Sequence, residues 1–215
     1  MKTTKARDQL IGLLADLDEE AVLQLVHQRL TAGDDPLQII EDANEGLRQV
    51  GLRYEQGEFF VSGLIMSGEI FREVVELVQP LLERQANGQS AGTVLVGTVS
   101  GDIHDIGKNI AGMLLACHGF TVIDLGVDVP PAVFAAKAIE IQPDVVGLSG
   151  LITASFEAMK ATITALRAEA QAHHCYFPIV VGGGMIDAQI CRYVGADYWV
   201  TNAMDGVRLC QRLVA

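Results

Sequence analysis

One stretch of the chain combines residue types that can bind a metal ion or move a proton. Residues 96–112, VGTVSGDIHDIGKNIAG, place His104 between two aspartates in a loop bounded by Gly101 and Gly107. Glycine lets the backbone turn tightly or approach a ligand closely. A carboxylate two residues away can hold the δ nitrogen of the imidazole, which leaves the ε nitrogen for a metal ion or a proton. The loop therefore predicts an axial metal ligand, and its alternative is a histidine that caps the following helix.

Other sites built on glycine-rich loops fit this stretch poorly. The dinucleotide pattern GxGxxG is absent from it, and the phosphate-binding pattern GxxxxGK[ST] fails because asparagine follows Gly107–Lys108. A zinc site made from Asp102, His104 and Asp105 would lack further convergent ligands. Nucleotide and zinc binding are therefore weaker interpretations of the loop than an axial ligand.

The composition limits the partners of the chain. Its 215 residues are 50% hydrophobic and carry a formal net charge of −12 with scattered basic residues, whereas nucleic-acid binding needs clustered Lys and Arg. The start, MKTTKARDQL, is polar, and no apolar run reaches the roughly 20 residues that span a bilayer. We expect a cytoplasmic protein that binds neither nucleic acid nor membranes. No CxxC pair occurs, so we expect reduced core thiols at Cys117, Cys175, Cys191 and Cys210.

The N-terminal part shows the periodicity of helices. Up to about residue 84, apolar residues recur at helical spacing, with expected helix boundaries at Asp18, Gly33 and Asp35–Pro36. We expect about four helices that form a bundle, the domain of residues 1–88. The small polar residues of QANGQSAG, 85–92, suit a linker.

From Thr93 onward, short β-rich runs alternate with helical segments. Five alternations predict a doubly wound α/β domain over residues 89–215, Rossmann-like or flavodoxin-like, with a five-stranded parallel sheet and helices on both faces. In such a sheet, ligands bind beyond the carboxyl ends of the strands, near the point where the winding reverses. His104 follows the first expected strand and should lie at that edge. The expected strands are TVLVGTV, FTVIDL, DVVGLSG, PIVVGG and YWVT.

Three motifs together resemble a known family. GDIHDIGKNI, then VVGLSGLITAS, then IVVGGG are similar to the cobalamin-binding domain of methionine synthase and of the small corrinoid proteins of methyltransferase systems. The resemblance extends to the N-terminal half, because RYEQGEFFVSGLIMSGEIFREVVELVQPLL is similar to the helical segment that caps the upper face of the cofactor in those relatives. The family pattern D-x-H-x-x-G, S-x-L and G-G is matched by Asp102, His104, Gly107, Ser149, Leu151, Gly182 and Gly183.

This resemblance implies a cofactor and a ligand for it. The cofactor would be cobalamin, as methylcobalamin or a related corrinoid, with its cobalt bound from below by His104 after the nucleotide tail has left the metal. Asp102 would accept a hydrogen bond from His104, and Ser155 would continue that chain. Lys108 would contact the corrin edge or cap the helix. Further implied contacts are Ile103, Asp105, Ile106, Gly107, Ser149, Leu151, Thr153, Gly182, Gly183 and Gly184.

Small side chains suit a narrow channel for the nucleotide tail. Ser149, Gly150 and the glycines at 182–184 are the expected channel walls. Taken singly, these glycines have the alternative of a strand-to-helix turn, and Ser149 has the alternative of a polar strand end bonded to backbone. Only the joint pattern favours the channel.

The upper face of the cofactor would be covered by the helical half. Tyr54 and Val61 align with the phenylalanine and leucine that shield the cobalt-bound methyl group in methionine synthase, and Phe60 could serve in place of either. The alternative is that Tyr54, Phe59 and Phe60 belong to the bundle core, as aromatics at helical spacing usually do.

The resemblance implies a corrinoid methyl carrier. A substrate-specific corrinoid methyltransferase would methylate Co(I), a methylcorrinoid:acceptor methyltransferase would pass the methyl group to tetrahydrofolate or a thiol such as coenzyme M, and a corrinoid reductive activase would be a further partner. The polypeptide would control ligation and access while the cofactor carries the chemistry. The alternatives are a cobalamin-dependent sensor, which usually adds a DNA-binding or signalling module, and a carbon-skeleton mutase subunit, which lacks the helical cap. The methyl donor stays open among methanol, methylamines, betaines and aryl methyl ethers.

Overall fold

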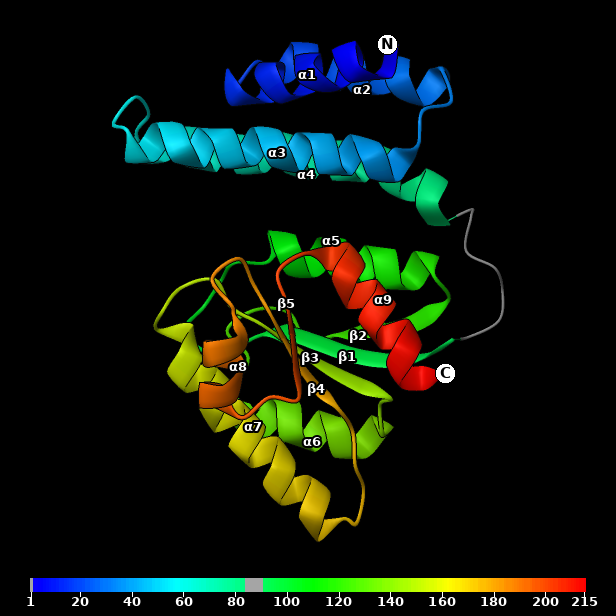
Figure 1. Ribbon diagram of the computed structural model, residues 1–215, viewed down its shortest axis with the longest axis vertical. Coiled ribbons are helices and arrows are strands. Elements are labelled where there is room, and N and C mark those ends of the chain that lie inside the picture. Colours follow the sequence, from blue (N-terminus) through cyan, green and yellow to red (C-terminus); the bar gives the residue numbers. More distant parts are fainter. Residues whose placement is uncertain (1, 84–90) are drawn as a thin grey trace. The chain divides into compact units, whose positions relative to one another are not determined.

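The chain folds into two compact units, Met1–Gln85 and Ala86–Ala215 (Figure 1). The computed structural model describes residues 2–83 and 91–215. Most of the linker expected at 85–92, and the domain boundary expected after residue 88, fall outside these described residues. The two units have separate cores.

The N-terminal unit contains the four helices that the periodicity predicts. Helices α1 and α2 form one layer and α3 and α4 a second layer against it (Figure 1). Asp18 and Asp35 cap α2 and α3 with their carboxylates, as expected from their positions. The apolar stripes face inward, with Leu10, Val26, Ile39, Phe71 and Val74 almost fully buried. The helices are α1 (Lys2–Ala15), α2 (Glu19–Thr31), α3 (Pro36–Glu55) and α4 (Val61–Glu83).

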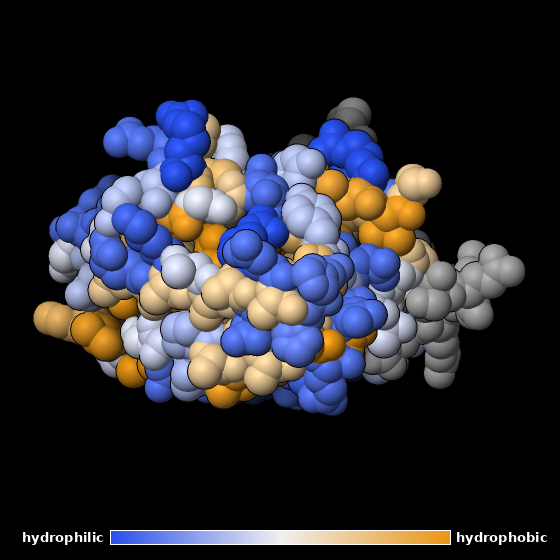
Figure 2. Space-filling model, turned by 90° about the horizontal axis from the view of Figure 1, so that it is seen from below, coloured by the Kyte–Doolittle hydropathy of each residue, from blue (hydrophilic) through white to orange (hydrophobic). Residues whose placement is uncertain are grey.

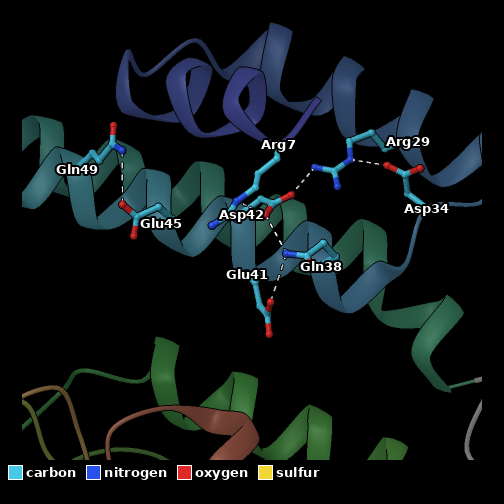
Figure 3. Close-up of polar contacts among 8 residues, drawn as sticks. All are labelled: Arg7, Arg29, Asp34, Gln38, Glu41, Asp42, Glu45 and Gln49. Atoms are coloured by element: carbon cyan, nitrogen blue, oxygen red, sulfur yellow. Dashed lines mark hydrogen bonds and ion pairs between the residues drawn. The ribbon is translucent and has the colours of Figure 1, made fainter. Parts of the chain in front are cut away.

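A buried ion-pair cluster links three of these helices (Figure 3). Asp42 of α3 has no exposed surface, and its Oδ2 accepts a hydrogen bond from Nη1 of Arg29 on α2 at 2.7 Å. Its Oδ1 accepts from Nε2 of Gln38 at 3.0 Å and lies 3.4 Å from Nε of Arg7 on α1. Arg29 also donates to Asp34 at 2.8 Å. Because a buried carboxylate is costly unless it is paired, this cluster fixes how α1, α2 and α3 pack.

The C-terminal unit is built on a five-stranded parallel sheet in the order β2-β1-β3-β4-β5. This order confirms the predicted doubly wound fold, with the winding reversed between β1 and β3. Most residues of the two central strands, β1 and β3, are buried because both faces of the sheet are covered. The strands are β1 (Gly92–Thr98), β2 (Phe120–Asp124), β3 (Val145–Ser149), β4 (Ile179–Gly182) and β5 (Tyr198–Val200).

Helices cover both faces of this sheet. Helices α5 and α9 contact one another on one face, and α6, α7 and α8 lie on the other (Figure 1). Phe134 of α6 and Met159 of α7 are buried in one core cluster with Leu95 and Leu148 of the sheet. The helices are α5 (Ile106–Cys117), α6 (Pro131–Ile141), α7 (Ser155–Ala172), α8 (Ala188–Val194) and α9 (Ala203–Val214).

The surface of the protein carries both hydrophilic and hydrophobic residues. On the side seen in Figure 2, hydrophilic residues are interleaved with small hydrophobic patches. In the part of the chain that the structure describes, no helix is both long and apolar enough to cross a membrane. All four cysteines lie within that part, and no disulfide joins them.

The pairing register of β1 and β3 places the loops that follow them side by side at the carboxyl edge of the sheet. Thr98, the last residue of β1, pairs with Ser149, the last residue of β3. The loops that follow β1 and β3 therefore begin side by side, at the point where the winding reverses. Ligands of doubly wound folds bind at this kind of point.

Candidate functional site

His104 lies in the loop between β1 and α5, at the carboxyl edge of the sheet. The loop begins with Val99, whose N–H donates to the carbonyl oxygen of Ser149 at 3.0 Å. Further along, the hydroxyl of Thr98, a fully buried residue, donates to the carbonyl oxygen of His104 at 3.1 Å. The backbone of the loop thus forms hydrogen bonds with β1 and β3. The His104 side chain keeps 49% of its surface exposed.

Asp102 is the centre of the hydrogen bonds around this histidine. Its Oδ1 lies 2.6 Å from Nδ1 of His104 and accepts the His104 backbone N–H at 3.0 Å. Its Oδ2 accepts the Leu151 N–H at 2.7 Å and the Ser155 hydroxyl at 2.5 Å. Asp102 and Ser155 are each only 1% exposed. The expected chain from His104 through Asp102 to Ser155 is therefore present, and it joins the loops after β1 and β3.

The electrostatics of this chain favour an ionised Asp102. Burial by itself would raise the pKa of this carboxyl group. Hydrogen bonds from the Ser155 hydroxyl, the His104 and Leu151 amides and the His104 ring outweigh burial and hold the pKa well below its usual range. An ionised carboxylate only accepts hydrogen bonds, so Nδ1 of His104 must carry the hydrogen. The lone pair of this imidazole then lies on Nε2, for which the described residues provide no hydrogen-bond partner.

The alternatives for the loop histidine fit this geometry less well. The ring of His104 bonds to Asp102 and makes no bond to the start of α5. Asp105 stands at the N-cap position of α5 without a side-chain cap bond, and its Oδ2 accepts from Asn109 at 3.1 Å. Over residues 2–83 and 91–215, no group of three or more His, Cys, Asp or Glu could hold a metal ion. The donor set is thus one outward imidazole, which suits an axial ligand of a metal whose other ligands come with a cofactor.

Lys108 is buried near the start of α5, and its contact with the corrin edge stays a prediction. Its side chain is only 4% exposed, and its Nζ forms an ion pair with Asp124 at the end of β2 and donates to Oδ1 of Asn109 at 2.7 Å. It does not cap α5, because a helix start offers N–H donors and Lys108 is itself a donor. This lysine joins α5 to β2 and fixes the helix that follows the His104 loop.

Exposed apolar side chains surround the carboxyl edge of the sheet. Of the predicted contacts, Ile103 is 74% exposed and Leu151 is 41% exposed. Three more lie in the loops after β2, β3 and β4 and were not predicted: Val127, Ile152 and Met185, at 39%, 39% and 54% exposed. Their signal in the sequence is an apolar residue just beyond a strand. Such side chains are suited to burial under a large, partly apolar ligand.

The glycines after β4 differ in what they allow. Gly183 has a φ of 153°, and a Cβ there would lie 2.0 Å from the carbonyl oxygen of Gly150, so no other residue fits. A Cβ at Gly182 or Gly184 would meet side chains only at 3.5 and 3.8 Å, which are ordinary contacts. The close approach of the Gly150 carbonyl oxygen therefore explains the glycine at position 183 without a ligand. A role of these residues and of half-buried Ser149 as channel walls stays a prediction.

The remaining predicted residues are placed as follows. Thr153 is exposed in the turn before α7, Ile106 begins α5, and Gly107 is exposed in the first turn of that helix, where a Cβ would meet no atom within 4 Å. Tyr54 and Val61 belong to the helical unit, at the end of α3 and the start of α4. Their roles as cofactor contacts stay predictions.

Two of the aromatic residues expected at the upper face lie outside the core of the helical unit. Tyr54 is 41% exposed and Phe60 is 81% exposed, so the alternative that they are bundle core is wrong for both. Phe59 is half-buried, and the guanidinium carbon of Arg53 lies 5.1 Å from the centre of its ring. Val61, beside these residues, is 57% exposed.

Comparisons with known proteins cover both units of the chain. Residues 92–208 and residues 6–79 match two family models, each described as a B12 binding domain. The chain is 34% identical over 213 residues to a corrinoid protein of Desulfitobacterium hafniense, covering 96% of each. It is 33% identical over 209 residues to trimethylamine corrinoid protein 1 of Methanosarcina acetivorans, covering 94% of this chain and 92% of that protein. The solved structure of the Methanosarcina barkeri monomethylamine corrinoid protein matches with a TM-score of 0.88 and 26% identity, over 98% of this chain and 99% of that one.

Proposed function

We propose a methyl-carrier function from one premise: the chain belongs to the family of corrinoid proteins that are built from B12-binding domains, and its cofactor is cobalamin or a related corrinoid. In this proposal the cofactor binds with its nucleotide base off the cobalt, and His104 is the lower axial ligand. One observation carries the proposal. The buried Asp102 holds Nδ1 of a half-exposed imidazole at 2.6 Å and so leaves Nε2 as the donor atom.

The residues at the carboxyl edge fit such a cofactor. A corrin ring supplies its own equatorial ligands, so the protein needs to provide a single donor, and the described residues offer one imidazole there without a further cluster of ligands. The exposed apolar residues Ile103, Leu151 and Met185 supply surface for the edge of a large ring. Other proposed cofactor contacts are Asp105, Ile106, Gly107, Ser149, Thr153, Gly182, Gly183 and Gly184.

The hydrogen-bonded chain controls the charge and position of the ligand. When bound, the corrinoid supplies a cobalt ion that accepts and releases a methyl group. Asp102 orients the imidazole through Nδ1–H and, as an anion, raises the basicity of Nε2. As an anion, Asp102 would also stabilise the His104 ring whenever that ring carries a positive charge.

The helical unit is proposed to cover the upper face of the cofactor. Tyr54 and Val61 are the proposed cap residues, and their exposure in the helical unit supports this role because they are available to a ligand. Phe60, which is 81% exposed, is the alternative cap residue. An apolar cover of this kind would exclude water from a reactive methyl group.

The proposed partners are separate enzymes. A substrate-specific corrinoid methyltransferase would deliver the methyl group, a methylcorrinoid:acceptor methyltransferase would remove it, and a corrinoid reductive activase would restore the reduced cofactor. Methylamines are the first donors to test, because two similar proteins are named for trimethylamine and monomethylamine. The acceptor, tetrahydrofolate or coenzyme M, is to be tested in the same assay.

Reconstitution with hydroxocobalamin and methylcobalamin tests the lower ligation. We expect the absorbance spectrum of a displaced nucleotide base, and we expect His104→Ala to change this spectrum and weaken binding. The matched control is His118→Ala, because that ring bonds to the carbonyl oxygen of Leu114 within α5 at 2.8 Å and takes no part in the proposed site. An unchanged spectrum and affinity in His104→Ala would remove His104 from the role. Methylation of the reduced holoprotein by a candidate methyltransferase tests the carrier function itself.

A further inference from the structure

An aspartate in the loop after β2 binds the start of the His104 loop. Oδ1 of Asp128 accepts the Gly101 backbone N–H at 2.7 Å and lies 3.3 Å from the Ser100 hydroxyl, which donates to it. The backbone N–H of Asp128 donates to the carbonyl oxygen of Asp102 at 3.0 Å. Three hydrogen bonds thus connect one residue to residues 100–102, directly before the ligand loop reaches His104.

Asp128 is itself held by its neighbours. Its φ of 52° lies in the left-handed region, which is uncommon for a residue with a side chain. The next residue, Val129, is 2% exposed, forms a parallel bridge with Val99 and donates its N–H to the Thr98 carbonyl oxygen at 3.0 Å. Pro130 and Pro131 follow, and proline fixes φ. The carboxylate is therefore presented from a segment with little freedom to move.

We propose that Asp128 is a positioning residue for the lower ligand, an inference that rests on the proposed role of His104. Asp102 contacts both the backbone N–H and the ring of His104, so a shift of Asp102 would move the imidazole. By holding the Asp102 backbone and the preceding turn, Asp128 keeps Nε2 directed outward before the cofactor arrives. The loop then loses less conformational freedom when the cofactor binds.

A second aspartate provides a matched control at the other end of β1. Oδ2 of Asp144 accepts the Thr93 N–H at 2.7 Å, and the Asp144 N–H donates to the Thr93 carbonyl oxygen at 2.9 Å. This is the same type of two-way contact, but it lies at the amino edge of the sheet, away from His104. A purely structural role predicts similar effects of removing either carboxylate.

The test uses the protein labelled with nitrogen-15 histidine and loaded with the Co(II) corrinoid. Electron paramagnetic resonance measures the doublet splitting from a bound histidine nitrogen, called the nitrogen splitting here; a bound nucleotide base would give a triplet instead. Asp128→Gly removes the carboxylate and permits the positive φ, whereas Asp128→Asn keeps an acceptor oxygen and suits that φ. We expect Asp128→Gly to lower the ratio of nitrogen-bound to unbound cobalt about tenfold, the size expected for one or two lost hydrogen bonds. Asp128→Asn and Asp144→Gly should stay close to the wild type.

The outcomes separate this inference from the proposed function. If the wild type shows no nitrogen splitting, the role of His104 fails and the role of Asp128 fails with it. If the wild type shows splitting and Asp128→Gly retains it, only the inference on Asp128 is overturned. Equal losses in Asp128→Gly and Asp144→Gly also overturn it, because they indicate a structural role. Asp128→Ala is a second side-chain deletion if the glycine variant does not fold, and wild-type ligation in either folded variant contradicts the inference.

Discussion

Each unit of the protein contains a fully buried aspartate, and the two carboxylates are compensated in opposite ways. Asp42 of the helical unit pairs with Arg29 at 2.7 Å and lies 3.4 Å from Arg7. Asp102 of the α/β unit accepts hydrogen bonds from backbone amides, the Ser155 hydroxyl and the His104 ring. No lysine or arginine within the described ranges contacts Asp102.

The difference indicates which charge is structural and which is available for function. A guanidinium is always protonated, so the charge of Asp42 is cancelled permanently inside the bundle. The partner of Asp102 is an imidazole that can gain or lose a proton and whose side chain is half exposed. The Asp102 charge can therefore act on whatever His104 binds.

Loss of Arg29, the buried partner of Asp42, should cause the largest loss of stability. Arg29→Ala leaves Asp42 buried with only Arg7 and Gln38 nearby, and we expect the free energy of unfolding to fall by about 3–5 kcal/mol. Urea unfolding followed by far-UV circular dichroism measures this, while fluorescence of Trp199, the single tryptophan, reports the α/β unit. Arg48→Ala is the control, because its ion pair with Glu45 is exposed and its loss should cost far less stability than the loss of Arg29. Equal losses in both variants would contradict a structural role for the buried pair.

Removal of the other buried carboxylate should destabilise the α/β unit. Asp102→Ala leaves the Leu151 N–H and the Ser155 hydroxyl without their acceptor, and unsatisfied buried donors cost about 1–3 kcal/mol each. We expect a loss of about 3 kcal/mol in the transition followed by Trp199 fluorescence. Asp144→Ala removes an exposed acceptor of one N–H and should cost less than about 1.5 kcal/mol. A larger loss of stability in Asp144→Ala than in Asp102→Ala would contradict the central place of Asp102 in the hydrogen bonds around His104.

The lowered pKa of Asp102 predicts an acid-sensitive contribution to stability. The pKa of the Asp102 carboxyl group is about 3.9 in the unfolded chain and lower in the folded protein. As the pH falls below about 3.9, this group is protonated in the unfolded chain but stays ionised in the folded protein, so the free energy of unfolding decreases. The slope from this one group is at most about 1.4 kcal/mol per pH unit. Urea unfolding of the wild type and of Asp102→Asn, followed through Trp199 from about pH 6 to about pH 3, measures the difference. The gap between the two proteins should narrow in acid, and parallel curves would speak against an ionised Asp102.

Helix caps in the two units should give the smallest effects. Asp18 accepts the Ala21 N–H at 3.2 Å at the start of α2, and Asp187 accepts the Gln189 and Ile190 N–H groups at 2.8 Å each at the start of α8. Replacing either by alanine should cost about 1 kcal/mol, with the larger loss at Asp187. Circular dichroism should report the first and Trp199 fluorescence the second, while asparagine at either position should retain most of the stability. A shift of the Trp199 transition by Asp18→Ala would contradict separate cores, because Asp18 lies in the helical unit.

The sequence predicts the parts of the fold that depend on neighbouring residues. The capping role of Asp18 and Asp35 follows from their positions before apolar runs. Four strands lie within the expected runs, and β1 begins one residue before its run, at Gly92. The contact between Asp102 and Ser155 joins residues far apart in the chain, so only the resemblance could suggest it. The contact of Asp128 with the His104 loop depends on how the loops after β1 and β2 meet, which periodicity does not specify. Lys108 illustrates the same limit, because its burial against Asp124 requires the packing of α5 on β2.

The central claim is that Nε2 of His104 is the donor atom below the cobalt, and isotope labelling of histidine tests it directly. The Co(II) corrinoid protein is prepared once with natural histidine and once with histidine enriched in nitrogen-15, and the two paramagnetic resonance spectra are compared. The proposed ligation predicts that the triplet splitting of each cobalt line becomes a doublet, because the ligating nitrogen then belongs to the protein. A triplet that survives the labelling would show that the nucleotide base of the cofactor still binds the metal, and it would contradict this account.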